Sequence, residues 1–308
     1  FVYHTCSDLY WKTLSEKGGN LNLGVPGIMY LGGIASLAGA YGYENAVENP
    51  NKVIAFIIAL VCAVAASVFG GLIYSFLTIS LRANQNVTGL TLTIFGSGVA
   101  NFFGGSLSKL AGGVGQISVP VTSSAYKVGI PGVNFGILVY VAIVVAFVAQ
   151  YFLTGTRKGL NLRAVGENPA TADAAGVNIV KYKYLATCIG AGLSGIGGLY
   201  YVLDYNQGIW ATTGQIEALG WLAVALVIFT TWKPLNCIWG AYLFGMLYWL
   251  YQFLPSILGI KVASYVTDLI QMVPYVVTII VLVVVSFRKK KENQPPESLG
   301  LSYFREER

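Results

Sequence analysis

The stretch VIAFIIALVCAVAASVFGGLIYSFLTI, from Val53 to Ile79, runs for 27 residues without a charged side chain. At about 1.5 Å rise per residue, a helix of this length exceeds the roughly 30 Å of a bilayer core. Seven further apolar segments, separated by polar loops, cover residues 24–43, 87–103, 135–153, 184–203, 218–232, 235–254 and 265–287. The pattern predicts an all-α, polytopic membrane helix bundle of about eight segments. Segment 218–232 is short for a straight crossing, and we interpret it as a candidate half-helix.

The composition agrees with this fold class. Of the 308 residues, 55% are hydrophobic and 10% are charged, and the mean hydropathy is +0.64. A soluble domain carries about 25% charged residues, so soluble enzymes and disordered tails are excluded as classes. The four cysteines are far apart and form no Cys-x-x-Cys pair, which indicates neither a disulfide framework nor a zinc site.

The basic residues predict the orientation in the membrane. With strict alternation of the spans, 15 of the 19 Lys and Arg residues fall on one side, because only Lys52, Lys109, Lys127 and Lys261 fall on the other. By the positive-inside rule, the 154–183 loop and both ends of this chain are expected in the cytoplasm. The net charge of +6 is then a consequence of topology and does not indicate binding to nucleic acid.

The chain divides into three parts. Residues 24–287 form the expected membrane domain, which contains the cytoplasmic loop 154–183. Residues 1–23 form an atypical N-terminal segment, since Phe1 begins a stretch with charged residues and no apolar leader, and we interpret it as the start of a fragment. Residues 288–308, with Pro295-Pro296 and mixed charges, are expected to be a flexible cytoplasmic tail.

Catalytic and metal-binding patterns are missing from the sequence. No Gly-x-x-x-x-Gly-Lys-Ser/Thr motif occurs, and His4 is the only histidine. We find no nucleophile paired with a base in the apolar segments, no paired carboxylates and no metal-ligand cluster. The residues therefore give no sign of covalent chemistry, and we expect this chain to hold no cofactor and no metal.

The 154–183 loop contains a short helix with signals at both ends. Asn168 is a good N-cap, Pro169 suits the first helical position, and Gly176 suits the stop. An isolated helix of about two turns is marginal in water, so it needs a packing partner. From the residues alone, an ordinary surface helix and a partner-binding helix both remain open.

Three motifs in this chain resemble those of ABC importer permease subunits of the branched-chain amino acid and simple-sugar group. The first is Leu162-Arg163-Ala164-Val165-Gly166 with Asn168-Pro169 and Ala174-Ala175-Gly176-Val177, which is similar to the coupling loop of these permeases. The others are Ser15-Glu16-Lys17-Gly18-Gly19-Asn20 and its continuation to Met29, and Ala83-Asn84-Gln85-Asn86-Val87-Thr88-Gly89-Leu90, which is similar to the nucleoside and simple-sugar branch. Pro26 departs from that branch, which usually has Glu there.

The resemblance implies a set of partners and a role for the loop. It implies a separate ABC ATPase subunit that holds ATP and Mg, a second and related permease in a heterodimer, and an extracytoplasmic binding protein that delivers nucleosides or simple sugars. It also implies a multi-pass position in a bacterial-type cell membrane. The residues expected to couple to the ATPase are Arg163, Gly166, Glu167, Asn168, Pro169, Ala174, Ala175 and Gly176.

The segment 87–103 is the most polar of the eight. If the helix starts before it, Asn84, Thr88 and Thr91 share one face and Gln85 lies nearby. Polar groups at this depth avoid lipid, so these four residues are candidates for a substrate pathway. Hydrogen bonding between helices explains them equally well, and both interpretations stay open.

Two more features bear on the mechanism. Ala186, Gly190, Ser194 and Gly198 recur every four residues, which predicts close helix packing. Asp268 is the clearest acidic residue inside an apolar block, and it is the main support for an alternative class, a secondary transporter driven by an ion gradient. That support is thin, because no internal repeat is visible.

Overall fold

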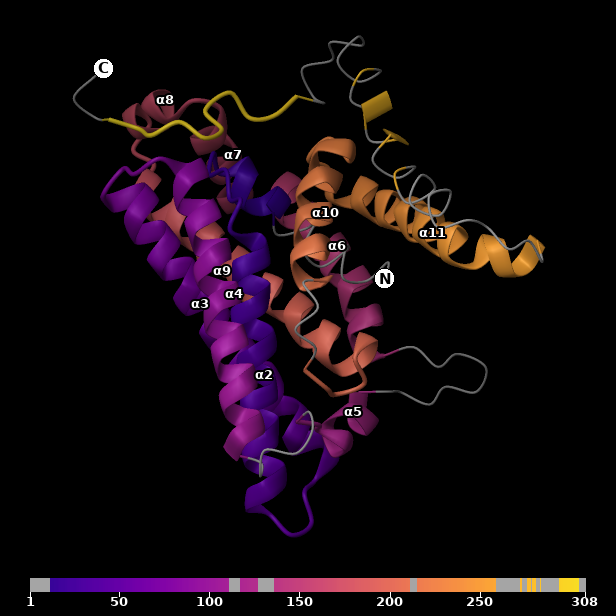
Figure 1. Ribbon diagram of the computed structural model, residues 1–308. Coiled ribbons are helices and arrows are strands. Elements are labelled where there is room, and N and C mark those ends of the chain that lie inside the picture. The colour runs from indigo at the N-terminus through magenta and orange to yellow at the C-terminus, as the bar shows by residue number, and fades with distance from the viewer. Residues whose placement is uncertain are drawn as a thin grey trace.

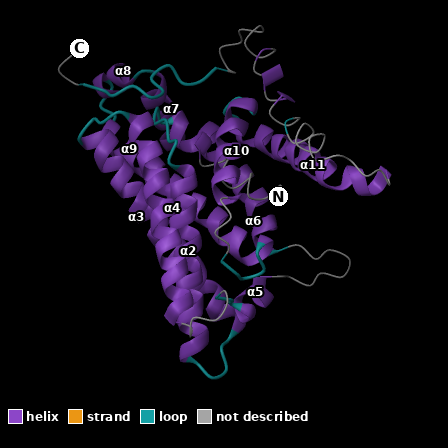
Figure 2. Ribbon diagram, viewed as in Figure 1, coloured by secondary structure: helices purple, strands orange, loops and turns teal. Residues whose placement is uncertain are grey.

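The computed structural model describes residues 12–110, 117–126, 136–210, 215–258 and 294–304, and a few positions between 272 and 283. Within these residues the chain is helical, and its extended pairing is limited to isolated bridges, such as the one between Ser118 and Ile209 (Figure 2). The predicted all-α class is confirmed.

The helices follow the apolar segments closely (Figure 1). In chain order they are α2 (Val25–Ala46), α3 (Lys52–Ser75), η1 (Phe76–Ser80), α4 (Gln85–Leu110), α5 (Pro120–Tyr126), α6 (Ile137–Gly155), α7 (Arg157–Glu167), α8 (Pro169–Ala174), α9 (Ile179–Tyr200), η2 (Tyr201–Tyr205), α10 (Gln215–Phe229) and α11 (Pro234–Leu258). The eighth predicted segment, 265–287, lies almost entirely outside the described residues, as does Asp268.

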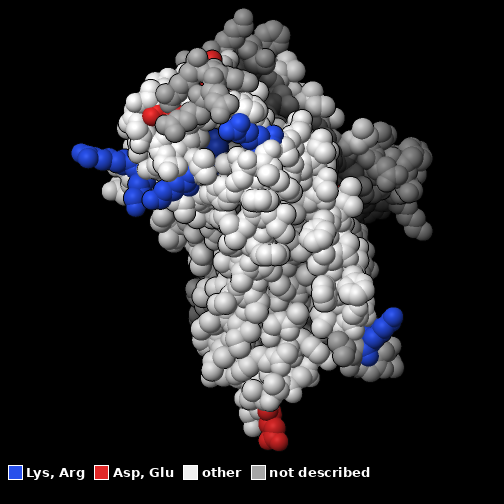
Figure 3. All heavy atoms as spheres, turned by 90° about the vertical axis from the view of Figure 1, so that its left-hand side faces the viewer, with Lys and Arg blue, Asp and Glu red and all other residues white. Residues whose placement is uncertain are grey.

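Among the residues that the structure describes, four helical stretches are long and apolar enough to cross a membrane: Lys52–Ser80, Gln85–Leu107, Ile137–Gly155 and Ile179–Tyr205. The helix α10 has 15 residues, in line with the expectation of a helix too short for a straight crossing. In the space-filling view, Lys, Arg, Asp and Glu gather at the two ends of the visible face, and a wide uncharged band separates them (Figure 3). This band is where the lipid would lie.

The helix α2 forms the centre of the bundle and packs against α3, α4, α9 and α10. Close approach depends on glycine. A Cβ atom at Gly27 would collide with the backbone of Leu92 on α4, and one at Gly198 would collide with the carbonyl oxygen of Met29. Ala186, Gly190, Ser194 and Gly198 are all buried, which confirms the predicted packing role of the small residues in this segment.

A short helix, α5, closes the end of the bundle that lies opposite α8 (Figure 1). The Glu44 carboxylate, near the end of α2, accepts hydrogen bonds from the backbone N and the hydroxyl of Thr122, at 2.8 and 2.6 Å. The Ser123 hydroxyl donates to the carbonyl oxygen of Leu203 at 3.1 Å. These contacts tie α2, α5 and η2 together. The stretch that contains α5 was expected to be a connection, although Pro120 suits a first helical position.

Candidate functional site

The helices α7 and α8 form a capped pair between the long helices α6 and α9. The Thr156 hydroxyl caps α7 by accepting from the backbone N of Gly159 at 3.0 Å. Asn168 then caps α8 by accepting from the backbone N of Thr171 at 3.0 Å, and Pro169 occupies the first position. Gly176 follows with φ of +80°, a left-handed conformation that favours glycine. The predicted short helix is confirmed, whereas α7 was expected to be loop.

One face of α8 is packed and the other is open. Ala172 is buried in a cluster with Val165 of α7 and Ile179 of α9. Ala170, Ala174 and Ala175 are exposed. A helix this short would not hold its shape alone, and the cluster supplies the packing partner that it needs. The exposed alanines leave backbone accessible to a neighbouring molecule.

Gly166 lies where α7 meets the N-terminal part of the chain. A Cβ atom at this position would collide with the carbonyl oxygen of Lys17, so a larger residue would push the two segments apart. The N-terminal motif therefore packs directly against the coupling loop. Among the remaining predicted coupling residues, Arg163 is half-buried, while Glu167, Asn168 and Gly176 are exposed.

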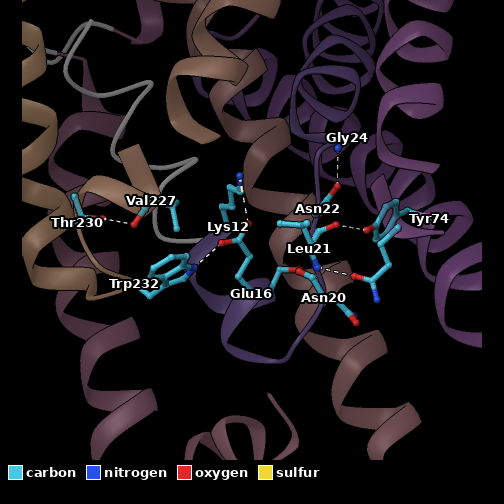
Figure 4. Close-up of polar contacts among 12 residues, drawn as sticks. Lys12, Glu16, Asn20, Leu21, Asn22, Gly24, Tyr74, Val227, Thr230 and Trp232 are labelled. Atoms are coloured by element: carbon cyan, nitrogen blue, oxygen red, sulfur yellow. Dashed lines mark hydrogen bonds and ion pairs between the residues drawn. The ribbon is translucent and has the colours of Figure 1, made fainter. Parts of the chain in front are cut away.

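The N-terminal motif begins with a short helix over residues 12–17 that carries a buried ion pair (Figure 4). The Lys12 ammonium lies 3.3 Å from the Glu16 carboxylate, and each side chain is 1% exposed. The indole N–H of Trp232, between α10 and α11, donates to the same carboxylate at 2.6 Å. Burial raises the pKa of Glu16 and lowers the pKa of Lys12, because both charged forms lose water. Their mutual attraction opposes both shifts.

Residues 18–24 lead from this helix to α2 with irregular backbone, and side chains hydrogen-bond to part of it (Figure 4). The backbone N of Leu21 donates to Gln85 at 2.7 Å, and the Tyr74 hydroxyl donates to the Leu21 carbonyl oxygen at 2.6 Å. The Asn20 amide donates to the Thr187 hydroxyl at 2.9 Å. Irregular backbone near membrane depth is tolerated only when protein surrounds it, and here α3, α4 and α9 do so. The motif thus joins α7 to three long helices.

The sequence did not predict that the N-terminal motif connects α7 to α3, α4 and α9. The motif was recognised only by its resemblance to a family, which assigned no contacts to it. The available signal was the run of Asn, Gly and Ser residues immediately before an apolar helix. The side chains of Asn and Ser can hydrogen-bond to backbone groups that have no partner within a regular helix.

The four predicted pathway residues do not form one site. Gln85 is buried, and its side-chain oxygen accepts from the backbone N of Leu21, so it supports the irregular backbone before α2 and does not link two helices. Asn84 is exposed and accepts from the backbone N of Asn86 at 3.0 Å, so it caps α4. Thr88 and Thr91 line a groove of about 430 Å³ between α3 and α4, next to Tyr74.

The groove is otherwise apolar, and both threonine hydroxyls donate to backbone carbonyls of their own helix, at 2.8 and 2.9 Å. Within the described ranges, no group of three or more His, Cys, Asp or Glu residues could hold a metal ion. The arrangement can shape a path or a helix contact, and it supplies no acid, base or nucleophile in that groove.

A helical bundle with an uncharged band between two charged ends is the architecture of a multi-pass membrane protein. Comparison with known proteins gives the family. Residues 12–282 match the family described as branched-chain amino acid transport system / permease component, and the chain belongs to it. It is therefore a permease component of an ABC transport system. No solved structure matches the chain.

Three relatives show where the chain lies in this family. It is 35% identical over 242 residues to the putative glucose ABC transporter permease protein TsgC13 of Haloferax volcanii, a match that covers 77% of this chain and 70% of that protein. It is 31% identical over 287 residues to the nucleoside ABC transporter permease protein NupC of Lactococcus lactis, a match that covers 87% of this chain and 84% of that protein. A shorter match is to the nucleoside ABC transporter permease protein NupB of the same organism. The two are 25% identical over 114 residues, which is 37% of this chain and 30% of that protein.

Proposed function

We propose that this chain imports nucleosides or simple sugars and that a separate ATPase subunit docks on the open face of α8. The geometry of α8 carries the proposal. Its buried face is fixed to α7 and α9 through Val165, Ala172 and Ile179, so a push on its open face moves both neighbours. The predicted coupling residues Arg163, Gly166, Glu167, Asn168, Pro169, Ala174, Ala175 and Gly176 belong to this surface or support it.

The proposal includes three partners. The ATPase subunit binds ATP and Mg, and this chain holds neither. An extracytoplasmic binding protein delivers the substrate at the α5 end. A second, related permease completes the membrane domain, and the two different nucleoside permeases of Lactococcus lactis that are similar to this chain support a heterodimer.

The substrate class rests on the names of the relatives, which mention glucose and nucleosides. Both are neutral molecules that are rich in hydroxyl groups. Neutral donors and acceptors such as those of Thr88 and Thr91 suit them, and we keep these two residues as pathway candidates. Asn84 and Gln85 belong to the same proposal, although their polar groups also support α4 and residues 18–24.

The docking step is tested by substituting Ala174→Arg and Ala175→Arg together and co-purifying the chain with the ATPase subunit of its transport system. Both alanines are exposed, so the permease should insert and fold normally. We expect ATPase recovery to fall to background, because bulky charged side chains prevent close approach. The control is Ala46→Arg, an exposed alanine at the opposite end of the bundle. Unchanged recovery with the α8 variant would refute docking at α8.

Uptake of labelled glucose and nucleosides into membrane vesicles tests the energy source in the same preparation. Uptake should persist with an uncoupler, should stop when internal ATP is removed, and should be lost in the α8 variant. Uptake that instead follows the ion gradient and ignores ATP would favour the secondary transporter.

A further inference from the structure

The C-terminal segment 294–304, which the sequence predicted to be flexible, packs across α7 and α8 (Figure 1, yellow). Ser298 is buried, and its hydroxyl and backbone N both donate to the Gly166 carbonyl oxygen. The backbone N of Gly300 donates to the Gly19 carbonyl oxygen at 3.2 Å. The segment is therefore attached to the coupling loop and to the N-terminal motif at once.

Two aromatic residues attach the end of this segment. The Tyr303 hydroxyl donates to the Asp173 carboxylate of α8 at 3.0 Å, and its ring packs against the cluster that holds α8. The Phe304 ring lies 4.6 Å from the Arg82 guanidinium, between η1 and α4. With Ser298 and Gly300, these contacts hold the segment beside α8 over its length.

The segment and the start of α8 enclose a groove of about 320 Å³. Pro169 and Ala170 line it from α8, and Leu301 and Tyr303 line it from the C-terminal segment. The Leu301 side chain is 62% exposed, although its neighbours fix the backbone around it. An apolar side chain held at the rim of a groove, beside the open face of α8, is the arrangement that a protein partner can use as an anchor.

We infer that residues 297–304 form the second wall of the ATPase docking surface, with Leu301 in direct contact with the ATPase subunit. The inference rests on the proposed function, since it assigns further residues to the same docking surface. The occupant follows from position: the groove continues the exposed face of α8, and it lies at the end of the bundle where the basic residues of the 154–183 loop gather. Two charged residues, Glu167 and Glu297, line the groove, so a lipid chain is not its occupant.

This wall gives the ATPase a second route into the membrane domain. A push on Leu301 passes through Gly300 to Gly19, and residues 18–24 are bonded to Gln85 of α4 and Thr187 of α9. The α8 route acts directly on α7 and α9, and it reaches residues 18–24 only through the contact of Gly166 with Lys17. The C-terminal segment therefore connects the docking surface to α4, which carries the pathway candidates.

The test is co-purification of the Leu301→Arg variant with the ATPase subunit. An arginine at this position puts a bulky charge where the contact needs a desolvated apolar side chain, so we expect recovery to fall about tenfold, which corresponds to about 1.4 kcal/mol. Leu301→Ser, which removes the apolar contact without adding charge, should reduce recovery by a smaller factor. The matched control is Gln294→Arg, on an exposed residue of the same segment that does not line the groove.

The outcomes separate this inference from the proposed function. Loss of the ATPase with Leu301→Arg and Leu301→Ser, but not with Gln294→Arg, supports the second wall. If the α8 variant loses the ATPase while both Leu301 variants retain it at the parent level, the inference is overturned and docking on α8 stands. If neither the α8 variant nor the Leu301 variants lose it, both proposals fail.

Discussion

At the scale of single residues, Lys12 and Glu16 place two charges inside protein where water cannot reach them. The ion pair and the Trp232 hydrogen bond compensate the desolvation of Glu16. Breaking such a pair from one side leaves a buried charge without a partner, at a cost of about 3–5 kcal/mol. The pair therefore links the helix over residues 12–17 to the α10–α11 connection.

A double-mutant cycle in detergent tests this link. Glu16→Gln and Lys12→Met should each lower the thermal midpoint strongly, because each leaves the other charge unpaired. The double variant should lose less than the sum of the two, by about 1–3 kcal/mol, since no unpaired charge remains. If the two single losses simply add, the ion pair is not what couples these residues.

The sequence could identify the residues of this region but not their contacts. The motif from Ser15 to Asn22 was recognisable, yet Asn20 bonds to Thr187 and Glu16 bonds to Trp232, which lie 167 and 216 positions away. No periodicity links residues so far apart. Gln85 illustrates the same limit: its spacing suited a pathway equally well, and only the fold places it against Leu21.

At the scale of elements, the sequence predicted the helix boundaries that depend on residues close to one another in the chain. Asn168, Pro169 and Gly176 set the limits of α8 as expected, because caps and turns act within a few residues. The apolar runs likewise predicted seven of the helices. The C-terminal segment was predicted to be flexible from its prolines and charges, whereas contacts with Gly166, Gly19 and Asp173 hold residues 294–304 in place. Tertiary contacts override composition there.

The contact between α2 and α9 gives a prediction at this scale. Gly198→Ala would bring a Cβ atom against the backbone of α2 at Met29, and we expect a loss of about 1–3 kcal/mol from overpacking. Gly98→Ala on α4 is the control, because nothing lies within 4 Å of its Cβ position, and alanine there should be neutral or stabilising. Thermal melting of both variants decides the matter. Equal midpoints would show that the two helices can separate at little cost.

At the scale of the whole molecule, the proposed mechanism depends on orientation. The basic residues of the 154–183 loop lie at the α8 end of the bundle, while Lys52 and Lys109 lie at the ends of α3 and α4 nearest α5. The positive-inside rule therefore predicts that α8, the N-terminal motif and the C-terminal segment lie together at the cytoplasmic end of the bundle. An ATPase can reach all three from that side, whereas a binding protein reaches the α5 end.

Cysteine labelling in intact cells tests this orientation before any partner is identified. Ala46→Cys and Ala175→Cys introduce exposed thiols at opposite ends of the bundle. A membrane-impermeant maleimide should label Ala46→Cys in intact cells and Ala175→Cys only after the membrane is opened. The parent chain is the control, because it retains the four native cysteines, of which Cys62 and Cys188 are half-buried and Cys237 is buried. Labelling of Ala175→Cys from outside would place α8 out of reach of ATP, and docking of an ATPase on both α8 and Leu301 would then be impossible.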